Sequence, residues 1–194
     1  MPTSTTSRRE RILNRLERDA RPEPNVVDAT FADVIAGEVS LEDFVGQLTL
    51  EELATLVRGD RVMNSPYGTP GNAGALGGIS DALAARGVPA VTATDGPSGI
   101  RLASFASLLP SGTALASTWD PALITELSAL LGQEMIALGS DVLLAPGMNI
   151  QRDPLCGRNF EYYSEDPLVT GTMAAAAVRG IQSQGVSACP KHFA

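Results

Sequence analysis

Hydrophobic and polar residues alternate in blocks along this chain, and the first well-marked block covers residues 48–60. The segment LTLEELATLVRGD has Thr49 as a candidate N-cap and Glu52 three residues later, which together form a capping box. Gly59 is typical of the end of a helix. The pattern therefore predicts a helix that begins after Thr49 and ends near Gly59.

Apolar and β-branched runs then alternate with helical segments. GVPAVTATDG (87–96) is bounded by glycine and proline, which predicts a buried strand. Asp120 followed by Pro121 is a helix start signal, and PALITELSALLGQEMIALG continues that helix. DVLLAPGMNI (141–150) is typical of the next strand.

The same alternation is repeated towards the end of the chain. Asp166 and Pro167 give a second helix start, and this helix is expected to end at about Gln184. VSACPKHF (186–193) predicts a third strand. Strands that alternate with helices of this length indicate βαβ units with right-handed crossovers and a parallel sheet.

Three segments lie outside this alternation. Residues 7–20 are expected to form a short charged helix, which the proline-containing segment 21–25 ends. We interpret residues 1–40 as a helical N-terminal extension and residues 41–194 as the first part of an α/β domain. Residues 64–79 hold five glycines and two prolines, which predicts a loop.

The alternation favours a barrel over a doubly wound sheet. TDGPSGIR follows a strand but lacks the G-x-G-x-x-G spacing of dinucleotide-binding folds. A (β/α)8 barrel takes about 250 residues, and only three strands are predicted here. We therefore expect the first strands and helices of an incomplete TIM-type barrel. The alternative is a small open α/β domain, complete as it stands.

Charge and composition narrow the functional classes. The net charge of -8 and the pI near 4.6 oppose binding to nucleic acid and to anionic membranes. Cys156 and Cys189 belong to no CxxC pair or Cys/His cluster, so we expect buried free thiols and no metal site. The sequence shows neither a signal peptide nor an apolar run of about 18 residues, which predicts a cytoplasmic protein.

Polar residues follow each predicted strand, at the edge where a parallel barrel places its active site. The third strand ends in the only lysine and the only histidine of the chain. The set consists of Asp95 after the first strand, Arg152, Asp153, Arg158 and Glu161 after the second, and Lys191 and His192 at the third.

These residue types suit a polyhydroxylated ligand better than a metal, a phosphate or a covalent mechanism. Too few His, Asp and Glu residues stand at ligand spacing for a metal, and the sequence has no Walker motif and no nucleophile elbow. A carboxylate can accept hydrogen bonds from two adjacent sugar hydroxyls, while Arg, Lys and His donate to the remaining oxygens.

Each of these residues also has a structural interpretation. Asp95 can cap a turn, and Arg158 and Glu161 can form a structural ion pair. Lys191 can extend along the end of a sheet, and His192 can serve packing alone. These interpretations lose weight because the residues fall at the same end of successive strands.

Four segments resemble the N-terminal domain of glycoside hydrolase family 3, the β-glucosidase family. They are TDGPSGIR, LPSGTALASTWDP, LLAPGMNIQRDPLCGRNFEYYSEDP and PKHFA, and they stand in the order and spacing of that family. The likeness runs from about Leu48 to the last residue. It implies a retaining, exo-acting enzyme that hydrolyses terminal β-D-glucosyl residues of a small β-glucoside or oligosaccharide, without cofactor or metal.

The resemblance also implies roles for individual residues. Asp95 matches the aspartate that holds the terminal sugar through its hydroxyls. Arg101, Arg158, Lys191 and His192 match its partners in the same subsite. All five are therefore expected to bind substrate.

The family's Asp nucleophile and Glu acid/base belong to later motifs, which the resemblance places beyond Ala194. We therefore expect this chain alone to be an inactive fragment, and we assign no catalytic role to Glu161 or Glu165. The alternatives are a β-xylosidase, another exo-glycosidase of the family, or a non-catalytic sugar-binding half-barrel. The β-N-acetylhexosaminidase branch reads KHFPGHG, whereas Ala194 follows Phe193 here. The oligomeric state stays open.

Overall fold

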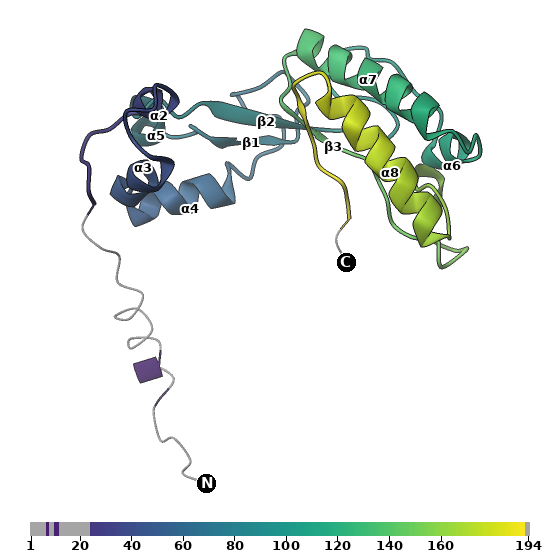
Figure 1. Ribbon diagram of the computed structural model, residues 1–194, viewed down its shortest axis with the longest axis horizontal. Helices are drawn as coiled ribbons and strands as arrows, with labels where there is room; N and C mark the ends of the chain where they lie inside the picture. The colour runs from purple at the N-terminus through teal and green to yellow at the C-terminus, as the bar shows by residue number, and fades with distance from the viewer. Residues whose placement is uncertain (1–6, 8–9, 12–23, 193–194) are drawn as a thin grey trace.

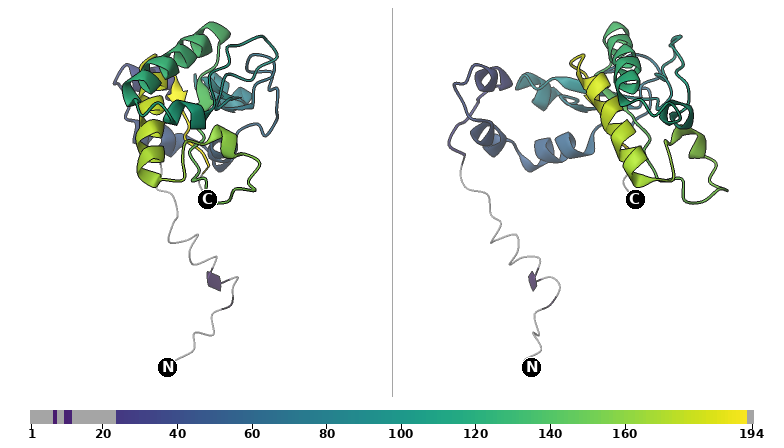
Figure 2. Two further views of the ribbon diagram at one scale, coloured as in Figure 1. Left: turned by 90° about the vertical axis from the view of Figure 1, so that its right-hand side faces the viewer. Right: turned by 45° about the vertical axis from the view of Figure 1, so that its right-hand side comes forward.

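The computed structural model describes residues 7, 10–11 and 24–192, and its elements form two groups joined by strands (Figure 1). Helices α2 to α5 lie at one end and helices α6 to α8 at the other, while β1 and β2 run between them (Figure 2). Most of the helix predicted at 7–20 lies outside the described residues. The elements are α2 (Phe31–Ile35), α3 (Leu41–Gln47), α4 (Leu50–Arg58), β1 (Gly74–Gly77), α5 (Asp81–Ala85), β2 (Ala90–Asp95), α6 (Gly112–Ala116), α7 (Pro121–Leu138), β3 (Val142–Leu144), η1 (Asn159–Glu161), α8 (Pro167–Gln182) and β4 (Ser187–Ala188).

The strands form one sheet in the order β1-β2-β3-β4. Strand β2 pairs parallel with β3, and β3 pairs parallel with β4. Helices α6 and α7 connect β2 to β3, and η1 and α8 connect β3 to β4. The predicted α/β class with parallel strand–helix units is confirmed.

Strand β1 lies inside segment 64–79, so the prediction of a loop throughout that segment is wrong. It pairs antiparallel with β2, in the register that places Gly74 opposite Ala93. Its sequence, GALG, has no β-branched residue, which is why the pattern does not reveal it. The fully buried amide of Asn72 positions the start of the strand, because Oδ1 accepts from the backbone N–H groups of Ser65 and Gly74.

Strands β3 and β4 are only three and two residues long, shorter than predicted. Pro146 and Pro190 follow them, and a proline has no N–H group to donate to a strand ladder. Pairing resumes in an isolated parallel bridge between Gly147 and Lys191. This bridge extends the contact between the two chain segments to the edge where the site lies.

Helices α4, α7 and α8 begin where the sequence predicts. Thr49 and Glu52 exchange the two hydrogen bonds of a capping box, and α4 ends at Gly59 with a φ of 65°. Asp120 and Asp166 each accept from two backbone N–H groups in the first turn of α7 and α8. These caps satisfy donors that a helix start leaves unpaired.

Helices α7 and α8 lie side by side because small residues stand between them (Figures 1 and 2). A Cβ atom at Gly180 would lie 2.2 Å from the Thr125 carbonyl oxygen, and one at Gly132 would lie 2.7 Å from that of Ile181. The Thr125 hydroxyl also donates to the Ala176 carbonyl at 3.2 Å. The close contact fixes the direction of α8, and therefore of the chain that leads into β4.

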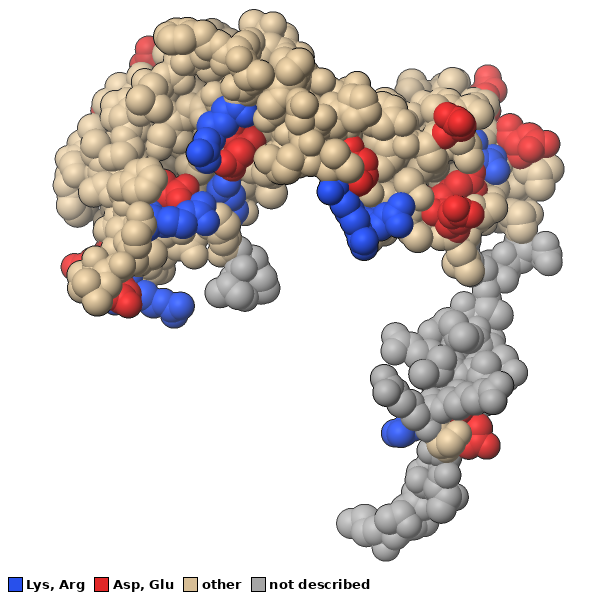
Figure 3. Space-filling model, turned by 180° about the vertical axis from the view of Figure 1, so that it is seen from behind, with Lys and Arg blue, Asp and Glu red and all other residues tan. Residues whose placement is uncertain are grey.

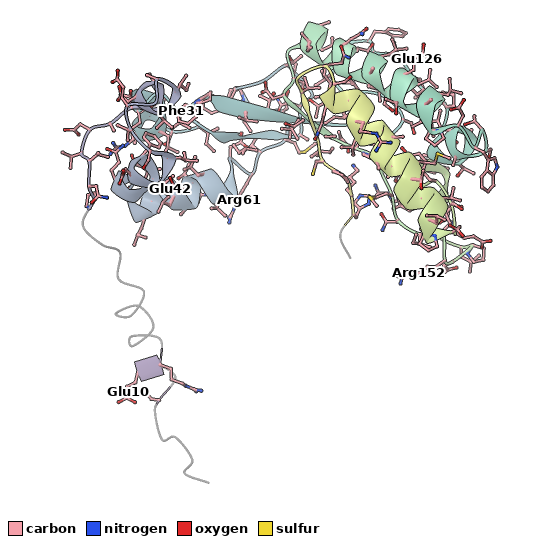
Figure 4. All side chains as sticks on the ribbon, in the orientation of Figure 1. Glu10, Phe31, Glu42, Arg61, Glu126 and Arg152 are labelled. Atoms are coloured by element: carbon pink, nitrogen blue, oxygen red, sulfur yellow. The ribbon has the colours of Figure 1, made fainter. Side chains whose placement is uncertain are left out.

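Buried apolar side chains form three clusters, one of which joins α2, α3 and α5. In that cluster Ala29, Phe44, Leu48 and Leu83 are buried. The ring of Phe31, which is labelled in Figure 4, meets that of Phe44 edge to face, with centroids 5.9 Å apart. Residues before position 41 thus pack against later ones, while the domain division at residue 40 stays a prediction. The other clusters are Leu115, Ala116, Ile124, Tyr163, Met173, Ala174, Ala176 and Ala177, and Ile100, Leu131, Met135, Leu143, Ala145 and Ile181.

Both cysteines are free and exposed, so the expectation of buried thiols is wrong. Cys156 lies in the loop between β3 and η1, and Cys189 directly follows the edge strand β4. Neither place lies within a layer that packs on both sides. Among the described residues, no helix is both long enough and apolar enough to cross a membrane.

Candidate binding site at the strand ends

Asp95 is the last residue of β2 and forms the centre of a cluster of charged side chains. One carboxylate oxygen, Oδ1, accepts from Nζ of Lys191, and the other, Oδ2, accepts from Nη1 of Arg101 at 2.9 Å. The side chains of Asp95 and Lys191 are 28% and 16% exposed, and that of Arg101 is 73% exposed. The structure thus brings together residues 96 positions apart in the sequence.

The turn after β2 brings Arg101 back beside Asp95, and two glycines make this turn possible. Gly96 has a φ of 147°, and a Cβ atom there would lie 1.9 Å from the Gly99 carbonyl oxygen. Gly99 has a φ of 149°, in a region that favours glycine. The chain then returns antiparallel, and the Arg101 N–H donates to the Asp95 carbonyl at 2.9 Å.

Lys191 is placed by the backbone beyond β4. Its N–H donates to the Pro146 carbonyl at 2.9 Å, and its own carbonyl accepts from the Met148 N–H at 2.7 Å. These bonds hold the segment after β4 against the segment after β3. From there the ammonium group reaches Asp95 at the end of β2.

Arg158 stands in the loop between β3 and α8, next to a buried carboxylate. Its Nε atom donates to Glu161, whose side chain is 7% exposed, while half of the Arg158 side chain stays exposed. Gln151 holds the loop in shape, because Nε2 donates to the Asn159 and Tyr162 carbonyls at 2.8 and 3.1 Å. The Arg158–Glu161 ion pair exists, and it uses only one of the guanidinium nitrogens among the described residues.

His192 follows Lys191 and is held by Asn149. Oδ1 of Asn149 lies 2.9 Å from the His192 backbone nitrogen and 2.9 Å from Nδ1 of the ring. The imidazole also meets the Tyr162 ring edge to face, with centroids 6.2 Å apart. Burial and the positive charges of Arg158 and Lys191 lower the pKa of His192, which favours the neutral form of the ring at pH 7.

Asp95 stays ionised although it is partly buried. Burial acts to raise the pKa of its carboxyl group, but the hydrogen bonds and charges of Lys191 and Arg101 outweigh it and lower the pKa. In Figure 3 positive and negative side chains lie next to one another along the hollowed underside of the molecule. Three cations, Arg101, Arg158 and Lys191, meet only two carboxylates, Asp95 and Glu161.

A cavity of about 370 Å³ adjoins this cluster, a volume within the usual range of small-molecule sites. Polar residues, among them Arg101, Arg158 and Glu161, line one part of it, and the exposed apolar residues Leu108 and Phe160 line another. Its lining residues are Gly96, Pro97, Ser98, Gly99, Arg101, Leu108, Arg158, Phe160 and Glu161.

Two of the polar residues that the sequence places after the strands, Arg152 and Asp153, lie outside the charged cluster. Arg152 projects from its loop away from the ribbon (Figure 4), and Asp153 accepts from the Leu155 N–H within a turn. Neither joins the charged cluster. Asn149 and Gln151 were missed, although both stand within the motif that carries the family resemblance, because an amide side chain gives no charge signal.

Sequence comparison decides the family. The model of the glycosyl hydrolase family 3 N terminal domain matches residues 73–194. The chain belongs to glycosyl hydrolase family 3. Its strand–helix units are therefore those of the family's N-terminal domain, which confirms the expected partial barrel.

Several family 3 proteins are similar to this chain. A beta-glucosidase of Ruminococcus albus is 52% identical over 164 residues, which cover 84% of this chain and 17% of that protein. A solved beta-glucosidase of Paenibacillus barengoltzii has a TM-score of 0.86 at 50% identity, covering 100% of this chain and 21% of that one. Beta-glucosidase 3B of Thermotoga neapolitana, solved in complex with alpha-D-glucose, has a TM-score of 0.70 at 40% identity, covering 80% and 23%. This family 3 chain thus spans about a fifth of the length of such relatives.

Proposed function

We propose that this chain supplies the part of a β-glucosidase that holds the terminal glucosyl residue of the substrate. The observation that carries the proposal is the ionised Asp95 at the end of β2, with Lys191 on one oxygen and Arg101 on the other. Arg158 and His192 lie near enough for the charge of Asp95 to influence the pKa of each. These five polar groups come from the ends of three strands, which supports their assignment to one subsite.

The chemistry of this cluster suits a sugar. Each carboxylate oxygen has a second lone pair, so Asp95 can accept from two neighbouring hydroxyls while it keeps its two cations. The cations outnumber the carboxylates and have further N–H groups for ring oxygens. A hydrogen bond to a charged group contributes about 1.5–3 kcal/mol, which is stronger than a neutral one.

The relatives support glucose as the sugar. The proteins that match in Ruminococcus albus and Butyrivibrio fibrisolvens are both named beta-glucosidases. The Thermotoga neapolitana enzyme was solved with glucose bound, and this chain resembles it at 40% identity. We propose that the substrate here is likewise a small neutral β-glucoside, met in the cytoplasm.

The role that we propose is binding and distortion of the sugar rather than bond cleavage. Retaining glycosidases cleave with one carboxylate as nucleophile and a second as acid/base. The family resemblance assigns neither role to a residue of this chain. Contacts to the ring hydroxyls that strengthen as the sugar distorts lower the barrier for groups supplied elsewhere in the enzyme.

The test is an exchange of segments. This chain replaces the matching fifth of the Paenibacillus barengoltzii beta-glucosidase, and hydrolysis of an aryl β-glucoside and of an aryl β-xyloside is measured. We expect hydrolysis of the glucoside by the hybrid and none by the chain alone. Preference for the xyloside would reassign the sugar, and a folded hybrid that binds glucose without hydrolysis would favour a sugar-binding module.

A further inference from the structure

The contact between Asn149 and His192 determines which nitrogen of the imidazole carries the proton. Asn149 lies in the chain after β3, and His192 lies in the chain after β4. One atom of the Asn149 amide lies 2.9 Å from the His192 backbone nitrogen and 2.9 Å from the Nδ1 atom of its ring. The two contacts share one atom, so they constrain each other.

The backbone contact identifies that atom as an oxygen. A backbone N–H group can only donate, so the atom of Asn149 that faces it must accept. An amide oxygen cannot donate in turn, so the hydrogen between it and the imidazole must be on Nδ1. In a neutral imidazole the proton on one nitrogen leaves the other as an acceptor, and Nε2 therefore has a free lone pair.

The surroundings of the ring favour its neutral form. The cations that face it are Arg158, from the loop before η1, and Lys191, from its own segment, and both disfavour a positive ring. Glu161 and Asp95 act in the opposite direction, and the Tyr162 ring packs edge-on against the imidazole. Burial is the largest cause of the lowered pKa, and the two cations add to it.

We propose that Asn149 is a positioning residue that holds His192 in the Nδ1–H tautomer, so that Nε2 accepts a hydrogen bond from a hydroxyl of the bound sugar. This rests on the proposed function. Arg101, Arg158 and Lys191 can only donate, and the two carboxylate oxygens of Asp95 already accept from Lys191 and Arg101. With Nε2 of His192 as a further acceptor, a sugar hydroxyl can donate to His192, and the same hydroxyl oxygen can accept from a cation.

The sole histidine of the chain makes this inference directly measurable. With 15N-labelled histidine, the spectrum of the full chain has the signals of one imidazole, and the two ring nitrogens report which of them is protonated. At pH 7 we expect a protonated Nδ1 and an unprotonated Nε2, with titration below the ordinary pKa of about 6.5.

Three variants separate positioning from general loosening of the loop. Asn149→Ala removes the acceptor, so the proton should move to Nε2 in most molecules. Asn149→Asp keeps an acceptor oxygen and adds a negative charge, so Nδ1–H should persist and the His192 pKa should rise. Asn159→Ala removes a side-chain bond to the Asp153 carbonyl in the same loop and should leave the tautomer unchanged.

Glucose affinity provides the second readout. Asn149→Ala should weaken glucose binding roughly three- to tenfold, as expected for the loss of one hydrogen bond. At pH 9, where the ring is neutral, Asn149→Asp should bind glucose with an affinity within about twofold of that of the unmodified chain. A protonated Nε2 in the unmodified chain, averaged signals of a mobile ring, or a tautomer that ignores Asn149→Ala would overturn the inference. Absence of glucose binding by the unmodified chain would instead count against the proposed function, because the tautomer is measured without ligand.

Discussion

Glu52 and Asp95 are two of the carboxylates that form ion pairs in the described part of the chain, and they differ in what surrounds them. Glu52 lies near the start of α4 with a side chain only 8% exposed. Oε1 accepts from Nε of Arg86 at 2.8 Å, and Oε2 accepts from the Thr49 N–H at 2.7 Å. One cation and one helix cap thus satisfy this carboxylate, and it holds α4 to the end of α5.

Asp95 has more cationic partners than Glu52, and its side chain is more exposed to solvent. Two cations contact its oxygens, Arg158 stands nearby, and its side chain is 28% exposed. A purely structural ion pair needs one cation for each carboxylate. A site for a neutral ligand rich in hydroxyls, by contrast, uses further N–H donors at an exposed edge. The difference between the two carboxylates therefore supports our proposal that Asp95, and not Glu52, binds the ligand.

The largest expected effect is the loss of activity on removal of the Asp95 carboxylate. In the hybrid enzyme, Asp95→Ala leaves two sugar hydroxyls without their charged acceptor, which we expect to cost about 3–4 kcal/mol in the transition state. That corresponds to a fall of about two to three decades in kcat/KM, much of it in kcat. Steady-state kinetics with an aryl β-glucoside measure it, and a loss confined to KM would contradict ring distortion at this site.

Removal of the Glu52 carboxylate should affect stability instead. Glu52→Ala breaks the capping box of α4 and leaves the partly buried Arg86 without its anion. We expect the free energy of unfolding to fall by about 1–3 kcal/mol, while glucose affinity of the folded protein stays unchanged. Urea unfolding and a glucose titration of the same sample test both parts, and a matching loss of affinity would erase the distinction between the two carboxylates.

Acidification should weaken the contributions of both carboxylates, because the pKa of each is shifted in the same direction. Burial acts to raise the pKa of Glu52 and of Asp95, but the hydrogen bonds of Arg86 and of Lys191, respectively, outweigh it, so the pKa of each is lowered. A lowered folded-state pKa adds stability that is present above the unfolded value, about 4, and is lost as pH falls through the folded value. The part of glucose binding that depends on the Asp95 carboxylate should therefore stay constant from pH 7 to 5 and fall only below about pH 4. A midpoint near pH 6 would point to His192 as the controlling group.

The smallest effect is expected at Arg101. Its side chain is 73% exposed, so solvent screens its pair with Asp95. Arg101→Lys keeps the charge but loses the planar guanidinium, and we expect glucose affinity to fall no more than about fivefold. A loss as large as that of Asp95→Ala, measured by the same titration, would show that Arg101 and not Asp95 dominates the subsite.

The sequence predicts the parts of the fold that have local signals. The caps Thr49, Asp120 and Asp166 mark three helices, because a side chain that satisfies the first N–H groups leaves a readable pattern. Strand β1 has no such signal, since its place depends on pairing with β2 and on the buried amide of Asn72, which links the start of the strand to Ser65. The ends of β3 and β4 do have a local signal, Pro146 and Pro190, and the predicted strands extend past these prolines.

The residues of the candidate site also fall into a part that the sequence predicts and a part that depends on the tertiary fold. Charged residues at strand ends are visible in the sequence, because parallel strands bring their carboxyl ends to one edge. The tautomer of His192 depends on an amide 43 residues away, and the apolar wall at Leu108 and Phe160 depends on how two loops fold. No local sequence pattern predicts the tautomer or the apolar wall. For this part of the site, the sequence offers only the family resemblance.

The most direct test of the central claim compares Asp95→Asn with Glu52→Gln in this chain. Each variant removes one negative charge and keeps the shape of the side chain. We expect Asp95→Asn to weaken glucose binding at least tenfold with little change in melting temperature, and Glu52→Gln to lower the melting temperature with unchanged affinity. Near-normal glucose binding by Asp95→Asn would reduce Asp95 to a turn cap and remove the basis for the proposed subsite.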